Sequence, residues 1–219
     1  MRVAIIGGGG HGSVVADIIE KLPQFNLIGF LDARHEPGSK ILGYEVLGTP
    51  DSLTLQILQH DLQGIVIAVG DNWIRSTLFE FVRATSTEID FPAIIHPSAQ
   101  IGKNVTIGQG TVVMPGVVVN SNVQIGDFCI VNTNASLDHD TTIGQFVSFA
   151  PKSCTGGGAS IGNFSAICLG TNVIDRITIG EHTVIGAGST VLHNQPACIV
   201  AYGIPARKTS DRQPGDRYL

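Results

Sequence analysis

Charged residues are scarce in this chain of 219 residues, where Asp, Glu, Lys and Arg make up 14% against about a quarter in average globular proteins. The net charge of −5 gives no basic surface for nucleic acid or an anionic membrane. No apolar run approaches the roughly 18 residues of a membrane span, and the apolar start of the chain is too short for a signal peptide. We therefore expect a cytoplasmic protein without nucleic-acid partners or a membrane span.

Cysteine is sparse as well, with four residues and no CxxC pair. This spacing favours reduced, buried thiols over a disulfide framework or a cysteine-based metal site. Glycine, by contrast, is abundant at 27 residues. So many glycines in a chain of ordinary hydrophobicity indicate a β architecture with frequent turns.

Residues 1–92 alternate between strand and helix patterns. Short apolar runs predict strands within residues 3–6, 27–32 and 64–70, and helical periodicity predicts helices within residues 12–22, 49–62 and 72–84. We expect four strands in this segment, the fourth outside these three runs. The alternation predicts a small Rossmann-like α/β domain with a parallel sheet that binds its ligand at the carboxyl ends of the strands.

From Ile95 the helical period stops and a six-residue period begins. Of the seventeen positions from Ile95 to Val191 in this frame, sixteen are aliphatic or Phe, Thr155 being the exception, and glycine follows in eight. Three hexapeptides make one triangular coil of 18 residues, stacked at about 4.8 Å. The pattern resembles the hexapeptide-repeat left-handed parallel β-helix and assigns residues 93–219 to that domain with a C-terminal tail. The alternative is a sandwich with accidental periodicity.

The triplet Asp138–His139–Asp140 stands out in the repeat, because from Ile95 to Asn194 the basic residues are only Lys103, Lys152 and Arg176. Leu137 points inward in the six-residue frame, so His139 lies at an outward corner, with Gly157 one coil later. A neighbouring carboxylate would fix the imidazole tautomer and make His139 a better general base. The alternative is a solvated corner without function.

A short α/β domain opened by GGGGHG and followed by hexapeptide repeats resembles the NeuD/PglD-type bacterial sugar acetyltransferases, over essentially the whole chain. The resemblance implies acetyl-CoA as co-substrate, His139 in "LDHDTTIGQF" as base, Asp140 as the residue that raises its basicity, and Asp138 as a carboxylate able to share that role. Ser148 stands where the family often has a second histidine near the thioester, so it is assigned to acetyl-CoA. The resemblance also implies a homotrimer with active sites between adjacent β-helices.

For acetyl-CoA, the resemblance implies a groove beside one corner of the helix and a basic closing motif, GIPARK. The residues so assigned are Gly157, Leu169, Gly170, Ala187 and Gly188 in the groove, with Arg207 and Lys208 for the phosphates. A backbone N–H near Gly157 would stabilise the oxyanion. The alternative for the two basic residues is a surface tail.

The first turn matches the dinucleotide fingerprint, with Gly7, Gly9 and Gly12 spaced as GxGxxG and Asp32 twenty residues later. A domain of about 92 residues is too small for two mononucleotide-binding halves, so we expect no NAD. The resemblance implies instead a nucleotide-linked sugar, held by the turn and by the segment after the third strand. The residues so assigned are Gly9, Gly10, His11, Asp32, Gly70, Asn72 and Trp73.

The sequence thus predicts an N-acetyltransferase acting on a UDP- or GDP-linked amino-deoxysugar for polysaccharide biosynthesis. O-acetylation of a sugar or sialic acid stays open as the alternative. A non-catalytic sugar-nucleotide-binding protein and a zinc enzyme of the γ-carbonic-anhydrase type are more remote. His139 and His193 share a corner but lie three coils apart, roughly 14 Å, too far to hold one metal within a chain.

Overall fold

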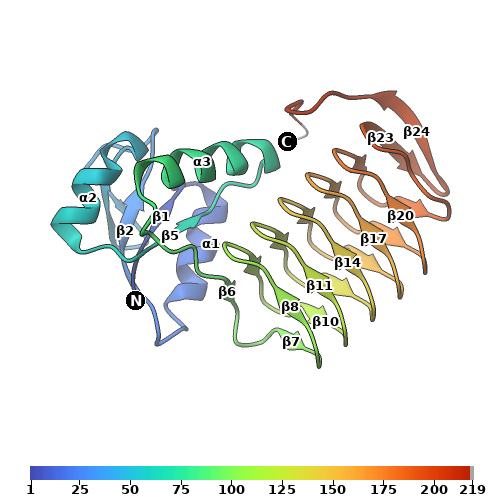
Figure 1. The fold of residues 1–219 in the computed structure, drawn as a ribbon, viewed down its shortest axis with the longest axis horizontal. Helices are drawn as coiled ribbons and strands as arrows, with labels where there is room; N and C mark the ends of the chain where they lie inside the picture. Colours follow the sequence, from blue (N-terminus) through green and yellow to red (C-terminus); the bar gives the residue numbers. More distant parts are fainter. Residues whose placement is uncertain (218–219) are drawn as a thin grey trace.

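The computed structural model describes residues 1–217. An α/β domain lies at one end, and from Ile94 onward the chain winds into stacked coils that run away from it (Figure 1). The C-terminal hairpin closes the far end, and the tail then returns toward α3 (Figure 1). We propose the domain boundary at residues 92–93, because the first coil strand begins directly after them.

The N-terminal domain contains one five-stranded sheet in the order β3-β4-β2-β1-β5. Its strands are β1 (Arg2–Ile6), β2 (Asn26–Leu31), β3 (Lys40–Ile41), β4 (Tyr44–Gly48) and β5 (Gly64–Ile67). Four strands were expected. The fifth comes from the β3–β4 hairpin, the one antiparallel pair in this sheet, whose two-residue first strand is too short to show a period.

Three α-helices accompany this sheet: α1 (Gly10–Ile19), α2 (Leu53–His60), which follows a 3-10 turn at Pro50–Ser52, and α3 (Asn72–Thr85). All three were predicted, with boundaries shifted by a few residues. The Asp71 carboxylate caps α3 by accepting a hydrogen bond from the Ile74 N–H at 2.9 Å. Among residues 1–217 no helix is long and apolar enough to cross a membrane.

The β-helix has three faces of parallel two-residue strands. Face I contains β7 (Gln100–Ile101), β10 (Val118–Val119), β13 (Ser136–Leu137), β16 (Cys154–Thr155), β19 (Asn172–Val173) and β22 (Thr190–Val191). Face II contains β8 (Thr106–Ile107), β11 (Gln124–Ile125), β14 (Thr142–Ile143), β17 (Ser160–Ile161) and β20 (Thr178–Ile179). Face III contains β6 (Ile94–Ile95), β9 (Val112–Val113), β12 (Ile130–Val131), β15 (Ser148–Phe149), β18 (Ala166–Ile167), β21 (Val184–Ile185), β23 (Ile199–Gly203) and the antiparallel β24 (Ala206–Asp211).

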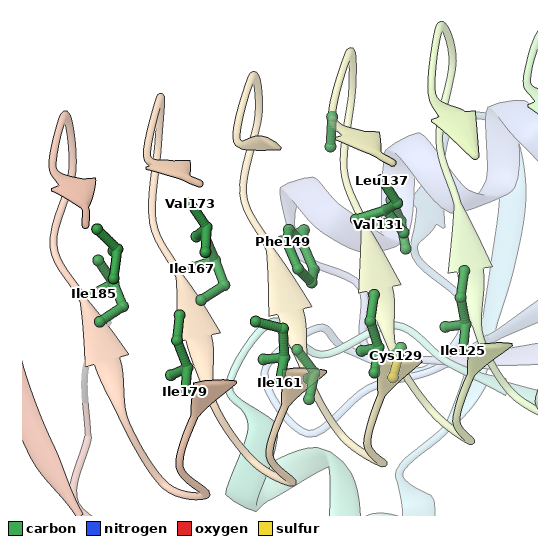
Figure 2. Close-up of a cluster of buried hydrophobic side chains, with 14 of the residues drawn as sticks. Ile125, Cys129, Val131, Leu137, Phe149, Ile161, Ile167, Val173, Ile179 and Ile185 are labelled. Carbon is green, nitrogen blue, oxygen red and sulfur yellow. The ribbon is translucent and has the colours of Figure 1, made fainter. Parts of the chain in front are cut away.

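Each residue of a coil strand pairs with the residue one coil later, as Val119 pairs with Leu137. The second residue of each strand points inward, and Figure 2 shows these side chains filling the interior. Ile101 is 40% exposed because no coil precedes its own. Thr155, the polar exception in the frame, is buried, and its hydroxyl accepts a hydrogen bond from the Asp138 N–H at 3.2 Å.

A ladder of rings joins the two domains. Phe128, Phe146, Phe164 and His182 occupy the same corner of successive coils and stack nearly parallel, with centroids 5.2, 5.1 and 4.7 Å apart. Helix α3 follows this ladder: Phe79 contacts Phe128, and Trp73 contacts Phe164. Six helical residues rise about 9 Å, which matches two coil spacings of about 4.8 Å.

A buried arginine completes the junction between the domains. The Arg75 side chain, 1% exposed, donates hydrogen bonds to the carbonyl oxygens of Phe128, Val69 and Gly70 at 2.7–3.0 Å and to the Asn72 side chain at 2.6 Å. The guanidinium fork thus links α3, the turn after β5 and the second coil.

We expect Arg75→Ala to lower the free energy of unfolding by about 3 kcal/mol, because it leaves several buried acceptors without a donor. Chemical denaturation with matched controls measures this change. Arg34→Ala, at an exposed position, should change stability by no more than about 0.5 kcal/mol. Equal effects of the two substitutions would contradict the assigned role of Arg75.

Candidate active site

His139 lies on the turn from β13 to β14, at the corner between faces I and II. Its side chain is 59% exposed. The imidazole Nδ1 and the Asp140 Oδ2 are 2.8 Å apart. Because an ionised carboxylate only accepts, the neutral ring carries its proton on Nδ1 and presents the Nε2 lone pair. The corner therefore holds a histidine poised as a base.

The two flanking aspartates have different partners. Asp138 Oδ1 accepts from the His139 backbone N–H at 2.8 Å and from the Asn120 amide at 2.6 Å, so Asp140 alone contacts the imidazole. The Asp140 hydrogen bond, followed by the negative charge of Asp138, raises the pKa of His139. Hydrogen bonds from His139 and Asn122 lower the pKa of Asp140, which stays ionised.

Gly157 gives the imidazole its space. A Cβ at this position would lie 2.6 Å from both Nε2 and Cε1 of His139. The Gly157 N–H donates to Asp175 Oδ1 at 3.0 Å, and the Gly158 N–H donates to the His139 carbonyl at 2.8 Å. Neither amide is free for an oxyanion, so the expected oxyanion donor at Gly157 does not agree with the structure. Gly157 contributes to the site because it has no side chain, which leaves room for the His139 ring.

A pocket of about 280 Å³ opens on face III, on the side that the N-terminal domain covers. Its walls are mostly apolar and come from β12, β15, β18 and the turns that follow them. Four residues expected to bind ligands line it together: His11, Gly70, Ser148 and Leu169. Asn132 also lines it. The sequence offered no signal for Asn132, since it occupies an ordinary polar turn position after β12.

His11 contributes to this pocket a polar atom, Nε2, that is buried and has no hydrogen-bond partner among the described residues. Burial, and then the positive charge of Arg75, lower the pKa of His11 to about 4, so the ring is neutral near pH 7. An unpaired buried nitrogen costs about 1–3 kcal/mol, which a polar ligand group in the pocket would recover.

The glycine-rich turn is open where a ligand is expected. A Cβ at Gly9 or Gly10 would meet no atom within 4 Å, and both residues are exposed at the start of α1. Backbone N–H groups at a helix start favour anions such as phosphate. The turn therefore has both space and polarity for a diphosphate.

Asp32 does not have the free carboxylate that the fingerprint predicts. Oδ2 accepts from the Gly8 N–H at 2.6 Å, and Oδ1 accepts from the Arg34 and His35 N–H groups and lies 2.8 Å from His35 Nδ1. Burial opposes ionisation, but these hydrogen bonds lower the pKa of Asp32 to about 2. Asp32 thus fixes the turn and His35, a neighbour that the fingerprint does not include.

Asn72 and Trp73 belong to the domain junction. The Asn72 amide donates to the carbonyl oxygens of Phe164 and Ser165 at 3.2 and 3.0 Å, and its oxygen accepts from Arg75 and from the Ser148 hydroxyl. Asn72 is 1% exposed, and its amide group is fully used by hydrogen bonds within the chain. It therefore does not reach the substrate position that the sequence predicted for it. Trp73 lies over Phe164 and His182, against the tail at Gly215, rather than on the pocket.

Ser148 reaches the pocket but not with a free hydroxyl, because this group donates to Asn72 Oδ1 at 2.6 Å. Four of the residues expected along acetyl-CoA form an open strip on the turns from face III to face I, whereas Gly157 lies apart from them at the corner of His139. Leu169 and Ala187 share one position of successive turns, Gly170 and Gly188 the next, and a Cβ at either glycine would meet nothing within 4 Å. Arg207 and Lys208 are exposed on β24, where Lys208 pairs with Asp211 at 2.5 Å.

Within one chain, His139 and the face III pocket lie on opposite sides of the β-helix. The coils run from face III to face I to face II, so the corner of His139 is the vertex opposite face III, where the pocket opens. The pocket lining accordingly does not include His139.

Family models match both parts of the chain: the PglD N-terminal domain over residues 2–82 and the bacterial transferase hexapeptide (six repeats) over residues 104–139. A UDP-N-acetylbacillosamine N-acetyltransferase of Bacillus subtilis is 38% identical over 116 residues, which is 52% of this chain and 51% of the relative. The chain thus spans about half the length of this curated relative in the alignment.

Two solved structures match over nearly the full length. PerB from Caulobacter crescentus, in complex with CoA and GDP-perosamine, is 34% identical, with a TM-score of 0.89 over 96% of this chain and 98% of the other. The acetyltransferase domain of PglB from Neisseria gonorrhoeae, in complex with acetyl coenzyme A, is 34% identical, with a TM-score of 0.85 over 95% and 98%. The chain therefore belongs to the PglD-type family of hexapeptide-repeat sugar acetyltransferases.

Proposed function

We propose that this protein transfers the acetyl group of acetyl-CoA to the amine of a nucleotide-linked amino-deoxysugar. The observation that carries this proposal is the His139–Asp140 pair, whose exposed imidazole lies against the bare Gly157. A relative that N-acetylates a bacillosamine nucleotide and a structure with CoA and GDP-perosamine support the substrate class.

In the proposed reaction His139 acts as general base without a covalent intermediate. The sugar amine attacks the thioester carbonyl, the new C–N bond forms and the C–S bond breaks. Nε2 of His139 accepts the amine proton and returns it to the departing CoA sulfur, while the ionised Asp140 stabilises the imidazolium through Nδ1. After one turnover His139 is neutral again, and the protonation state of the enzyme is unchanged.

We place the nucleotide at the open turn of Gly9 and Gly10 and the sugar toward His11 in the face III pocket. The neutral His11 can donate or accept one hydrogen bond through its unpaired nitrogen. Acetyl-CoA would lie along the strip of Leu169, Gly170, Ala187 and Gly188, with Arg207 and Lys208 for its phosphates. We propose no role for NAD, because the five-stranded sheet is too small for a second mononucleotide-binding half.

We further propose a homotrimer whose active sites lie between copies. Because the corner of His139 is opposite the pocket of its own chain, the base that serves a pocket would come from a neighbouring β-helix. A cyclic trimer gives each pocket one such neighbour and repeats the same contact three times.

The direct assay compares free amino sugars with their UDP- and GDP-linked forms, with CoA release measured by a thiol reagent and the product identified by mass spectrometry. We expect a higher kcat/KM for a nucleotide-linked amine than for its free sugar. A free sugar as the better acceptor, or an ester product, would instead support O-acetylation.

His139→Ala should lower kcat by roughly 10²–10⁴-fold with little change in acetyl-CoA binding. Activity requires unprotonated His139, so it should rise with pH through the raised pKa of this group. Asp140→Asn removes the main cause of that elevation and should shift the acidic limb of kcat/KM to lower pH while lowering kcat. Near-normal turnover in His139→Ala would contradict the mechanism.

Gly10→Asp tests the nucleotide position, because its added side chain has open space and should leave the fold intact. The new carboxylate would repel a diphosphate at the start of α1. We expect KM for the nucleotide sugar to rise roughly tenfold or more while KM for acetyl-CoA stays within about twofold. Gly10→Ser is the matched neutral control. Equal effects on both substrates would argue against this placement.

Co-expression of two variants, each lacking one of the two histidines, tests the shared site. In a cyclic trimer of His11→Ala and His139→Ala chains, roughly one quarter of the sites would combine intact His11 and intact His139, so activity should recover. The control pair, His139→Ala with Asp140→Ala, changes the same corner in both chains and should show no more activity than the two variants measured separately. A mixture of the first pair without recovery would place both residues of a site in one chain.

A further inference from the structure

A ladder of three polar side chains leads to the catalytic corner. Asn104, Asn122 and Asp140 occupy the same turn position in successive coils, with φ of 59°, 63° and 59°. The Asn104 amide donates to Asn122 Oδ1 at 3.1 Å, and the Asn122 amide donates to Asp140 Oδ1 at 3.0 Å. The hydrogen bonds run in one direction and end on the carboxylate that contacts His139.

This arrangement uses the two oxygens of Asp140 for different partners. Oδ1 accepts from Asn122 and Oδ2 from His139. Since the Asp140 side chain is 57% exposed, one hydrogen bond to an equally exposed imidazole would not hold the carboxylate in one rotamer against water. A second hydrogen bond on the opposite oxygen fixes the plane of the carboxylate, and with it the orientation of the ring.

The ladder of side chains ends at Asp140. One coil after Asp140 the position is Gly158, with φ of 66° and no side chain. No side chain at that position competes for Asp140 Oδ2. The other aspartate, Asp138, is held by Asn120 and the His139 N–H and does not reach the ring nitrogen. Asp138 and, from two coils later, Asp175 act on the imidazole through charge.

We propose that Asn122 is a positioning residue for the acetyl transfer, which holds Asp140 so that the carboxylate orients His139 with Nε2 free. The inference rests on the proposed function for its kinetic consequence, but the orientation of His139 is a property of the protein alone. The Asn122 side chain acts through Asp140 and contacts neither substrate in this account.

The backbone allows a clean substitution. The left-handed φ of Asn122 suits glycine, so Asn122→Gly removes the amide without strain. The turn keeps its hydrogen bonds from the Asn122 N–H to the Lys103 carbonyl and from the Asp140 N–H to the Ser121 carbonyl. Asn104→Gly is the matched control. Asn104 is the same residue type in the same conformation and belongs to the same ladder, but its amide donates to Asn122 rather than to Asp140.

We expect Asn122→Gly to lower kcat by roughly 3–30-fold, with both KM values within about twofold, and to shift the acidic limb of kcat/KM to lower pH. Asn104→Gly should change kcat by less than about twofold. In the Asp140→Asn background, Asn122→Gly should have no further effect, because the two residues act in series. An undiminished loss in that background, or an unshifted pH profile, would overturn the proposal.

A measurement without substrate separates this inference from the proposed function. NMR titration of ¹³C-labelled histidine should give a lower pKa for His139 in Asn122→Gly than in the wild type and the wild-type value in Asn104→Gly. An equal His139 pKa in all three proteins overturns the positioning role. A wild-type protein that acetylates no amino sugar overturns the proposed function, while the titration still decides on Asn122.

Discussion

The coil length of 18 residues is the constraint on which this structure depends. Because the two-residue strands from β6 to β22 pair from one coil to the next, their side chains lie over the residues 18 positions before them. Repetition at one corner therefore produces ladders. The rings from Phe128 to His182 pack against helix α3, and the amides of Asn104 and Asn122 lead to Asp140. The same register places the bare Gly157 against His139.

The second constraint is the junction between the domains. Arg75, Asn72 and Ser148 form a buried group that joins the turn after β5 to face III. This group fixes the N-terminal domain beside β15, so that His11 reaches the pocket on that face. As a result, these three polar side chains form hydrogen bonds with one another and are not available to a ligand. Two of them, Asn72 and Ser148, were expected to contact ligands, and the third carries a buried charge.

The six-residue frame predicted the β-helix and its inward residues because a fixed period leaves little freedom in the register. The same frame placed His139 on an outward corner. Thr155 breaks the pattern for a reason that the structure reveals: its hydroxyl accepts a hydrogen bond from the Asp138 N–H, behind the turn that carries His139. The ladder to Asp140 was within reach of the sequence, since Asn104 and Asn122 precede it at 36 and 18 residues.

Other parts of the site could not be predicted from local patterns. The fingerprint treats Asp32 as a free carboxylate, whereas four hydrogen-bond donors of the chain surround it. Arg75 looks like one more polar residue on an amphipathic helix, yet it is buried against a coil more than fifty residues away. Both outcomes depend on contacts between distant segments, which neither periodicity nor motif spacing encodes.

In the proposed reaction, His139 is the base for an amine bound at the pocket of a neighbouring chain. A crystal structure of the wild-type protein with CoA and a nucleotide-linked amino sugar tests this directly, because CoA without its acetyl group leaves both ligands unreacted. We predict the sugar amine within about 3 Å of His139 Nε2, with the nucleotide at Gly9 and Gly10 of the adjacent copy. A sugar amine bound away from every His139, or contacting the His139 of the chain that binds its nucleotide, would contradict the account.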